Sequence, residues 1–194
     1  MPSKTLILGS TSPFRRELLE RLAIPFETDS PEVDESRLGG ETPELLVRRL
    51  AESKARAVGL RHPDALVIGS DQVAVLEGEV MGKPGSPERA AEQLRRASGR
   101  TVTFLTGLCL LNTATDRAQV DVIPFEVTFR ELDDGRIRRY LAHDRPWNCA
   151  GSFKSEGLGI ALFRRMSGED PTALIGLPLI RLVEMLAAEG IVIP

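Results

Sequence analysis

Short apolar runs alternate along the chain with longer stretches in which apolar residues recur every three or four positions. The short runs are rich in branched side chains and end at glycine or at polar turns, which is typical of buried strands. The predicted strands cover residues 5–9, 25–28, 65–68, 101–112, 119–129 and 159–163. A hairpin is also expected where the apolar run 73–76 meets the turn at residues 77–79.

Three of the predicted helices begin with the same signal, a serine or threonine followed by proline. The hydroxyl group can cap the helix, and proline fits its first turn. The signals are Ser12-Pro13, Thr42-Pro43 and Ser86-Pro87, and the helices end near Leu22, Gly59 and Gly99. Further helices are expected at residues 133–142 and 177–189, with a short helical piece after Asp170-Pro171.

Helices and strands therefore interleave, but the long runs 101–112 and 119–129 are separated by a polar turn only. Two such runs are expected to pair as antiparallel neighbours. The prediction is an α/β fold with a mixed, twisted central sheet flanked by helices, rather than a purely parallel doubly wound sheet.

The composition narrows the class of protein. The chain has 194 residues, of which 42% are hydrophobic, and this suits a single domain over residues 1–194 with a real core, or two small lobes around one cleft. A net charge of -3 argues against a nucleic-acid-binding surface, and no segment approaches the roughly 18 apolar residues of a membrane span. With two cysteines, Cys109 and Cys149, neither a disulfide framework nor a zinc quartet is expected, and a reducing cytoplasm is the natural setting.

The stretch VIGSDQVAVLEGEVMGKP, residues 67–84, places polar groups at the end of an apolar strand. The strand is expected to stop at Gly69-Ser70, directly before Asp71 and Gln72. The chain then continues into the hairpin and reaches Lys83 between a glycine and a proline. An acid, an amide and a lysine in these positions are candidates for chemistry rather than for packing.

Basic residues stand in the first turn of the helix that follows Ser12. The N-terminal end of a helix dipole is positive, so Arg15 and Arg16 cost about 0.3–1 kcal/mol there at exposed sites. A strand, a tight turn, free helical N–H groups and two arginines together form a good anion site. From this stretch alone, phosphate binding and an ordinary capped helix with solvated arginines both remain open.

Two further segments carry charge in unusual places. Lys54 has helical spacing from Leu46 and Leu50, so it lies on an apolar stripe and either extends to solvent or reaches a buried anion. Lys154 and Glu156 lie in a glycine-flanked loop, where their spacing puts both side chains on one side of an extended backbone. A solvated turn is the ordinary alternative for this pair.

Taken together, the charged positions favour chemistry on phosphoanhydrides. Cations that clamp phosphates and carboxylates that bind a metal or activate water are what such hydrolysis requires. The candidate cations are Arg15, Lys54, Lys83 and Lys154, and the candidate carboxylates are Glu35, Asp71 and Glu156. The sequence has neither a Walker A loop nor a GxGxxG motif, which excludes the usual kinase, GTPase and dinucleotide-binding proteins. His62 and His143 have no nucleophile nearby in sequence, so Ser-His or Cys-His catalysis is not expected.

Seven motifs in order along nearly the whole chain resemble the Maf family of nucleotide pyrophosphatases. They are STSPFRRELL, PEVDE, ESKA, IGSDQV, GKP, AGSFKSEG and GLPL. The resemblance implies a Maf or ITPase-like fold with two lobes around a deep cleft, and hydrolysis of nucleoside triphosphates to monophosphate and pyrophosphate. It also implies a divalent cation (Mg²⁺, Mn²⁺ or Co²⁺), with Asp71 as proton acceptor and Glu35 and Asp71 as metal ligands. The substrate-binding residues that it implies are Ser10, Arg15, Lys54, Lys83 and Lys154.

Three positions depart from the commoner pattern of the family. Many members that resemble dTTP and UTP pyrophosphatases have arginine, threonine and glutamine where this chain has Phe14, Gln72 and Glu156. This set instead resembles the branch that hydrolyses 7-methyl-GTP, although an aromatic residue other than phenylalanine is common at the first position. A carboxylate can accept hydrogen bonds from the N1–H and N2–H₂ edge of guanine, and a cationic methylated base favours a carboxylate and an aromatic face.

Several alternatives stay open from the sequence. The substrate can be UTP, dTTP, CTP or another modified nucleotide, and the protein can be a non-catalytic nucleotide-binding regulator of cell division. Phe14 can be a core residue and Glu156 a metal ligand. The sequence also leaves open whether the chain forms a homodimer.

Overall fold

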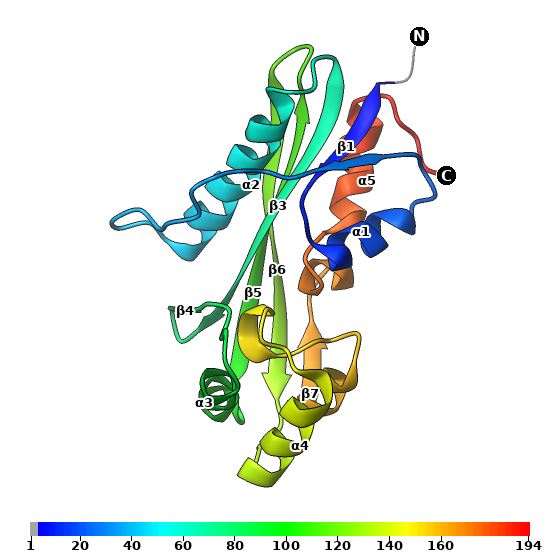
Figure 1. Ribbon diagram of the computed structural model, residues 1–194. Coiled ribbons are helices and arrows are strands. Elements are labelled where there is room, and N and C mark those ends of the chain that lie inside the picture. Colours follow the sequence, from blue (N-terminus) through cyan, green and yellow to red (C-terminus); the bar gives the residue numbers. More distant parts are fainter. Residues whose placement is uncertain (1–3) are drawn as a thin grey trace.

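The computed structural model describes residues 4–194, and within them a mixed sheet of seven strands forms the centre of the molecule (Figure 1). The sheet order is β2-β1-β3-β5-β6-β7, with β4 paired to β3. The strands are β1 (Thr5–Gly9), β2 (Glu27–Asp29), β3 (Ala65–Leu76), β4 (Glu79–Met81), β5 (Thr101–Asn112), β6 (Arg117–Phe129) and β7 (Phe163–Ser167). The α-helices are α1 (Pro13–Glu20), α2 (Pro43–Gly59), α3 (Pro87–Ala97), α4 (Asp134–Asp144) and α5 (Leu179–Ala188). Three short 3₁₀ helices are η1 (Ala150–Ser152), η2 (Leu158–Leu162) and η3 (Pro171–Leu174).

The sheet is parallel at one edge and antiparallel elsewhere. Strand β1 pairs in parallel with β2 and β3, whereas β3, β5, β6 and β7 pair in antiparallel fashion. The long strands β3, β5 and β6 run the length of the molecule and join two lobes (Figure 1). The first lobe contains β1, β2, α1, α2 and α5, and the second contains β4, α3, α4 and β7. The predicted mixed α/β fold is confirmed.

Alternation along β3 and β5 separates two packing layers in the first lobe. Leu66, Ile68 and Leu108 face α1 and α5, where they pack with residues such as Leu18 and Leu182. The residues between them along the strands, such as Val67 and Cys109, face α2 and pack against its residues Ala51, Ala55 and Val58. Because strand side chains alternate between faces, the sequence buries both sides of the strands.

Two glycines let helix α2 lie directly on the sheet. A Cβ atom at Gly69 would come 2.1 Å from the carbonyl oxygen of Ala51, and one at Gly107 would come 2.1 Å from that of Val47. Both distances are too short for any side chain, so α2 can pack this closely only because these positions are glycine. The helix thereby brings its later turns, including Lys54, against the middle of β3.

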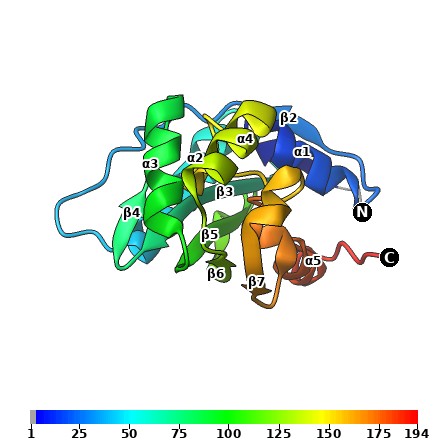
Figure 2. The ribbon, with the colours of Figure 1, turned by 90° about the horizontal axis from the view of Figure 1, so that it is seen from below.

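In the second lobe, α3 and α4 pack side by side (Figure 2). Its core contains four phenylalanines in edge-to-face contact, with ring centroids 4.7–5.7 Å apart; they are Phe104, Phe129, Phe153 and Phe163. Such pairs add about 0.5–1.5 kcal/mol each beyond their burial. Phe153 belongs to this core, and it therefore anchors the loop that carries Lys154 and Glu156.

Two predicted elements differ from the structure. Strand β3 does not stop at Gly69-Ser70 but continues to Leu76, because Asp71 pairs with Gly107 and the ladder to β5 satisfies the backbone groups of this segment. The strand predicted at residues 159–163 is mostly the 3₁₀ helix η2, and β7 begins only at Phe163. Gly159 lies against the backbone of Lys154, where a Cβ would come 2.2 Å from its carbonyl oxygen, so the chain folds back there instead of extending.

The other predicted helices and strands are present, with ends that differ by a few residues. Among the helices of residues 4–194 there is none with the length and apolar character that crossing a membrane requires.

Candidate active site

A polar cavity of about 470 Å³ lies between the two lobes. It is lined by side chains from the ends of β1 and α1, from the middle of β3 and from the loops of the second lobe. The predicted site residues among them are Ser10, Phe14, Arg15, Glu35, Lys54, Asp71, Gln72, Lys83 and Glu156. The fold thus brings nine of the ten predicted residues to one cavity.

Lys54 bridges two carboxylates at this cavity. Its Nζ atom lies 2.6 Å from Oδ1 of Asp71 and 2.6 Å from Oε1 of Glu35. The side chain of Lys54 is 7% exposed and that of Asp71 is 12% exposed. Of the two interpretations that the sequence left open, Lys54 therefore reaches a buried anion and does not extend to solvent.

The position of Asp71 follows from the geometry of β3. Gly69 and Asp71 are two residues apart and so point to the same face of the strand, toward α2. Gly69 makes room for the helix backbone at Ala51 and Ala55, and Asp71 meets Lys54, which lies between these two residues of the same helix. The glycine and the acid are consequently two parts of one packing arrangement.

Glu35 reaches the cavity from the loop between β2 and α2. Its side chain remains 56% exposed. The hydrogen bond from Lys54 lowers the pKa of Glu35, against the opposing effect of partial burial, and the charges of Lys83 and Arg15 lower the pKa further. This carboxylate is therefore ionised at neutral pH and available to a cation.

Arg15 is turned into the protein and not toward solvent. Its Nε donates to the carbonyl oxygen of Gly176 at 2.8 Å, and its Nη1 lies 3.4 Å from Oγ of Ser10. Burial lowers the pKa of Arg15, while the negative charges of Asp71 and Glu35 oppose that shift. Because an arginine guanidinium is not deprotonated in proteins, Arg15 presents a positive charge to the cavity.

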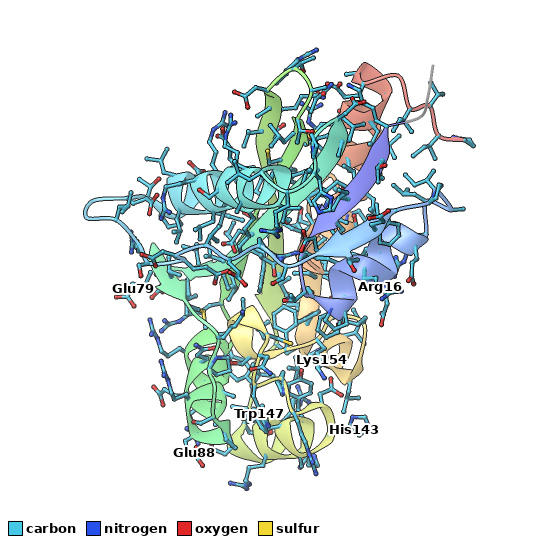
Figure 3. The ribbon with its side chains drawn as sticks, turned by 45° about the horizontal axis from the view of Figure 1, so that its top comes forward. Arg16, Glu79, Glu88, His143, Trp147 and Lys154 are labelled. Carbon is cyan, nitrogen blue, oxygen red and sulfur yellow. The ribbon has the colours of Figure 1, made fainter. Side chains whose placement is uncertain are left out.

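Arg16 shows the contrast with its neighbour. It forms a surface ion pair with Glu20, 3.1 Å away, and lies at the outer side of α1 (Figure 3). Of the two arginines in the first turn of α1, the structure therefore brings only Arg15 to the cavity.

Gln72 points to the face of β3 opposite Asp71. Its Nε2 donates to the carbonyl oxygens of Ala173 and Leu174, at 2.7 and 3.1 Å, and to Oγ1 of Thr106 at 3.0 Å. These contacts assign the amide nitrogen as the inward donor and leave Oε1 as the group that can accept a hydrogen bond from a ligand. Helix η3 therefore sets the orientation of Gln72.

The second lobe supplies Lys83 and Glu156, which are both exposed. Neither side chain contacts the Lys54 group. Oε2 of Glu156 accepts a hydrogen bond from the hydroxyl group of Ser155 at 3.1 Å. The loop that carries Lys83 is fixed through its backbone instead: the carbonyl oxygen of Gly82 accepts from Nε2 of Gln93 at 2.9 Å.

Lys154 is the predicted site residue that does not line the cavity. Its Nζ donates to the carbonyl oxygen of Asp144 at 3.0 Å, and its backbone N–H donates to the hydroxyl group of Tyr140 at 3.0 Å. Lys154 lies in the loop between α4 and β7 (Figure 3). In this structure it fastens that loop to α4.

Sequence reasoning missed several residues that line the cavity, notably Phe104, Asn148, Cys149 and Phe153. Phe104 and Phe153 also belong to the aromatic core, and the apolar pattern that marks a core residue gives no sign that one edge of the ring borders a cavity. Phe14 is half-buried and lines the cavity, so it is not an ordinary core residue.

The carboxylates suit a hard divalent cation that is bound together with a ligand. Within residues 4–194 there is no cluster of three or more His, Cys, Asp or Glu residues that could hold a metal ion by itself. Mg²⁺, however, is usually bound through one or two carboxylates together with substrate phosphates and waters. Lys54 contacts one oxygen of Glu35 and one of Asp71, which leaves each residue a second oxygen for such an ion.

The fold and the site together define a class of protein: a two-lobed mixed α/β protein whose cleft is lined by both cations and carboxylates. The fold is similar to that of the Staphylococcus aureus Ham1 protein, with a TM-score of 0.52, 15% sequence identity, and coverage of 96% of this chain and 100% of that one. At this level of identity the likeness concerns the fold alone.

The chain belongs to the Maf family. The family model described as "Maf-like protein" matches residues 5–189, which confirms the family that the sequence motifs predict. A Pseudomonas aeruginosa protein named 7-methyl-GTP pyrophosphatase is 64% identical, over 97% of this chain and 98% of its own length. Proteins of the same name from Nitrosococcus oceani and Alcanivorax borkumensis are 58% and 57% identical, over 96% and 98% of this chain and 94% and 96% of their own lengths.

Proposed function

We propose that the protein is a nucleoside triphosphate pyrophosphatase that hydrolyses 7-methyl-GTP to 7-methyl-GMP and pyrophosphate. The observation that carries this proposal is the group formed by Asp71, Lys54 and Glu35, with 2.6 Å contacts, in a cleft that Arg15 and Lys83 also line. The shared name of the relatives described above supports the same substrate.

In the proposed reaction, Asp71 accepts a proton from the attacking water. The oxygen of that water bonds to the α-phosphorus, the bond from this phosphorus to the α–β bridging oxygen breaks, and pyrophosphate leaves. Lys54 fixes the Asp71 carboxylate from the α2 side at 2.6 Å. A positioned general base contributes about 10²–10⁴ in rate, and a base that is already oriented loses no energy in reorganising during the reaction.

The cations of the two lobes would neutralise the phosphates. Arg15 is held by the Gly176 carbonyl at 2.8 Å, and Lys83 extends from the opposite lobe. Charge develops on the leaving pyrophosphate, and cations fixed in a partly dry cleft stabilise it more strongly than solvent does. Lys154 is assigned no direct phosphate contact, because its ammonium group binds the Asp144 carbonyl.

The proposal includes a divalent cation, Mg²⁺, Mn²⁺ or Co²⁺, held by Glu35 and Asp71. When bound, such an ion neutralises phosphate oxygens and polarises the phosphorus toward attack. The chain's own contribution is the second oxygen of each carboxylate, which Lys54 does not contact.

Base selection is assigned to Phe14, Gln72 and Glu156. Phe14 offers an aromatic surface to a cationic methylated base. The exposed carboxylate of Glu156 can accept from the N1–H and N2–H₂ edge of guanine, and Oε1 of the fixed Gln72 amide offers a further acceptor. Uracil and thymine present no such pair of donors.

Pyrophosphate release with Mn²⁺, measured across 7-methyl-GTP, GTP, UTP, CTP and dTTP, tests this function. We expect the highest kcat/KM on 7-methyl-GTP and a turnover at least about 10²-fold lower in Asp71→Asn. A higher kcat/KM on UTP or dTTP would support the pyrophosphatase activity but refute 7-methyl-GTP as the preferred substrate. Binding of nucleotides without pyrophosphate release from any of them would instead indicate a non-catalytic sensor.

A further inference from the structure

The loop that carries Glu35 raises the question of what fixes this residue in place. Residues 30–42 contain neither helix nor strand, and in Figure 1 this segment passes across β3 before it reaches α2. Glu35 itself contributes one ion pair, to Lys54, and its side chain is 56% exposed. An irregular loop with one exposed ion pair needs further contacts to keep a carboxylate aimed at a cavity.

Those contacts come from Glu41 at the end of the loop. Its carboxylate is 7% exposed and accepts two hydrogen bonds from Arg49 of α2, from Nε at 2.7 Å and from Nη2 at 2.9 Å. The backbone N–H of Leu38 donates to the same carboxylate at 3.1 Å. A forked guanidinium–carboxylate pair of this kind is both directional and strong.

Arg49 also holds the loop directly beside Glu35. Its Nη2 donates to the carbonyl oxygen of Ser36 at 3.0 Å. The guanidinium therefore joins the end of the loop, at Glu41, to the carbonyl group of Ser36, the residue that follows Glu35. Arg49 does not line the catalytic cavity but a separate groove, together with Leu38 and Gly40.

Arg49 and Lys54 lie on the same helix, five residues apart. Helix α2 thus contacts the Glu35 segment twice, with Lys54 at the carboxylate and with Arg49 at the neighbouring backbone. We propose that Arg49, through Glu41 and the Ser36 carbonyl, is a positioning residue that holds Glu35 at the cavity. This inference rests on the proposed function for the role of Glu35, but the contacts of Arg49 are independent of the substrate.

A double-mutant cycle tests whether Arg49 acts through Glu35. The variants are Arg49→Ala, Glu35→Gln and the combination, and Arg48→Ala is the matched control, because Arg48 is an exposed neighbour on the same helix. Misplacement of a catalytic group by about 1 Å can cost up to about 10²-fold, so we expect Arg49→Ala to lower kcat/KM by about tenfold. In the Glu35→Gln background the same change should lower it less than about twofold, because the group being positioned is already lost. Equal losses in both backgrounds would overturn the proposal.

Hydrogen exchange provides a readout that needs no turnover. In Arg49→Ala the amides of residues 32–41 should exchange faster, especially that of Leu38, while β3 keeps its protection. Arg48→Ala should leave the segment unchanged. If no nucleotide is hydrolysed at all, the proposed function fails, yet this measurement still decides whether Arg49 orders the loop. Unchanged exchange in residues 32–41 would refute the ordering role.

Arg49→Lys is a second variant that allows the proposal to be tested if Arg49→Ala fails to fold. Lysine keeps the charge next to Glu41 but cannot donate as a fork to Glu41 and to the Ser36 carbonyl together. We expect a melting temperature close to that of the unmodified protein, with faster exchange in residues 32–41 and a decrease in kcat/KM smaller than that of Arg49→Ala. Full activity with unchanged exchange would show that the forked contacts are not needed.

Discussion

The two walls of the cleft are built in different ways. On the first lobe, Lys54 joins Asp71 and Glu35 with contacts of 2.6 Å, and Arg15 is bonded to the Gly176 carbonyl. On the second lobe, Lys83 and Glu156 are exposed and neither contacts the charged residues of the opposite wall.

The loops of the second wall are held in place by hydrogen bonds to their backbone groups. Nε2 of Gln93 binds the Gly82 carbonyl, and the Gly85 N–H donates to the Trp147 carbonyl at 2.9 Å. The backbone of these loops is thus fixed, while the charged side chains of Lys83 and Glu156 make no contact with the opposite wall. Under the proposed function, the first wall would be organised in advance for the reaction, and the second wall would adapt to the base that it is proposed to select.

The largest expected effect is that of Asp71→Asn on the first wall. Asparagine cannot accept the proton from water, so turnover should decrease by at least about 10²-fold. The fold should persist, because Lys54 keeps its ion pair with Glu35. Pyrophosphate release measures the turnover, and a thermal melt shows whether the fold persists. Near-normal turnover would mean that the reaction is not centred on Asp71, and the comparison of the two walls would fail.

Arg15→Ala and Lys83→Ala compare one cation from each wall. A hydrogen bond to a charged group contributes about 1.5–3 kcal/mol, so each change should lower kcat/KM by about 10- to 150-fold. Arg15→Ala should also lower the melting temperature, because it removes a donor from the Gly176 carbonyl, whereas Lys83→Ala should not. Arg138→Ala, on the exposed side of α4, serves as the control. A loss of stability with Lys83→Ala would contradict the view that its side chain makes no contact with the opposite wall.

Glu156→Gln tests selection by the second wall. The amide turns one acceptor into a donor that faces a donor of the base, a mismatch of about 1–3 kcal/mol, or roughly 5- to 150-fold in kcat/KM for 7-methyl-GTP. UTP lacks that edge, so its rate should change little. A uniform loss on all nucleotides, partly restored by additional Mn²⁺, would instead make Glu156 a metal ligand.

The smallest effect concerns acid stability of the loop beside the first wall. Hydrogen bonds from Arg49 lower the pKa of Glu41 to about 2 from an ordinary value of 4.5. Because the folded-state pKa is the lower one, the stabilisation is present above about pH 4.5 and is lost as the pH decreases toward 2. Glu41→Gln should therefore lower the melting temperature at pH 6 and have little effect near pH 2. A difference in melting temperature between the two proteins that stays constant with pH would show that the charge of Glu41 does not stabilise the fold. The same substitution at the exposed Glu32 serves as the control.

Local patterns in the sequence were sufficient for most of the fold. The Ser-Pro and Thr-Pro pairs place the starts of α1, α2 and α3 correctly, because helix capping depends on residues within one turn. The two long β-rich runs predict the antiparallel pair β5 and β6. The motifs also indicate the family, and nine of the ten site residues predicted with its help line the cavity.

What the sequence could not decide were contacts between residues distant along the chain. Whether Lys54 extends to solvent or reaches Asp71 depends on how closely α2 approaches β3, and that distance is set by Gly69 and Gly107 on two different strands. The continuity of β3 through Asp71 likewise depends on its long partner β5, whose hydrogen bonds outweigh the poor strand propensity of Gly-Ser-Asp.

Lys154 and Arg49 show the same division between local pattern and tertiary structure. The resemblance to the Maf family implies that Lys154 binds substrate, yet its ammonium group binds the Asp144 carbonyl. Arg49 looks like any charged residue of an amphipathic helix, yet it binds Glu41 and the Ser36 carbonyl beside Glu35. The sequence determined the secondary structure and the set of charged groups, since both depend on neighbouring residues and residue type. Tertiary structure alone decided which of these groups meet, because those contacts depend on how the helices and loops pack against the sheet.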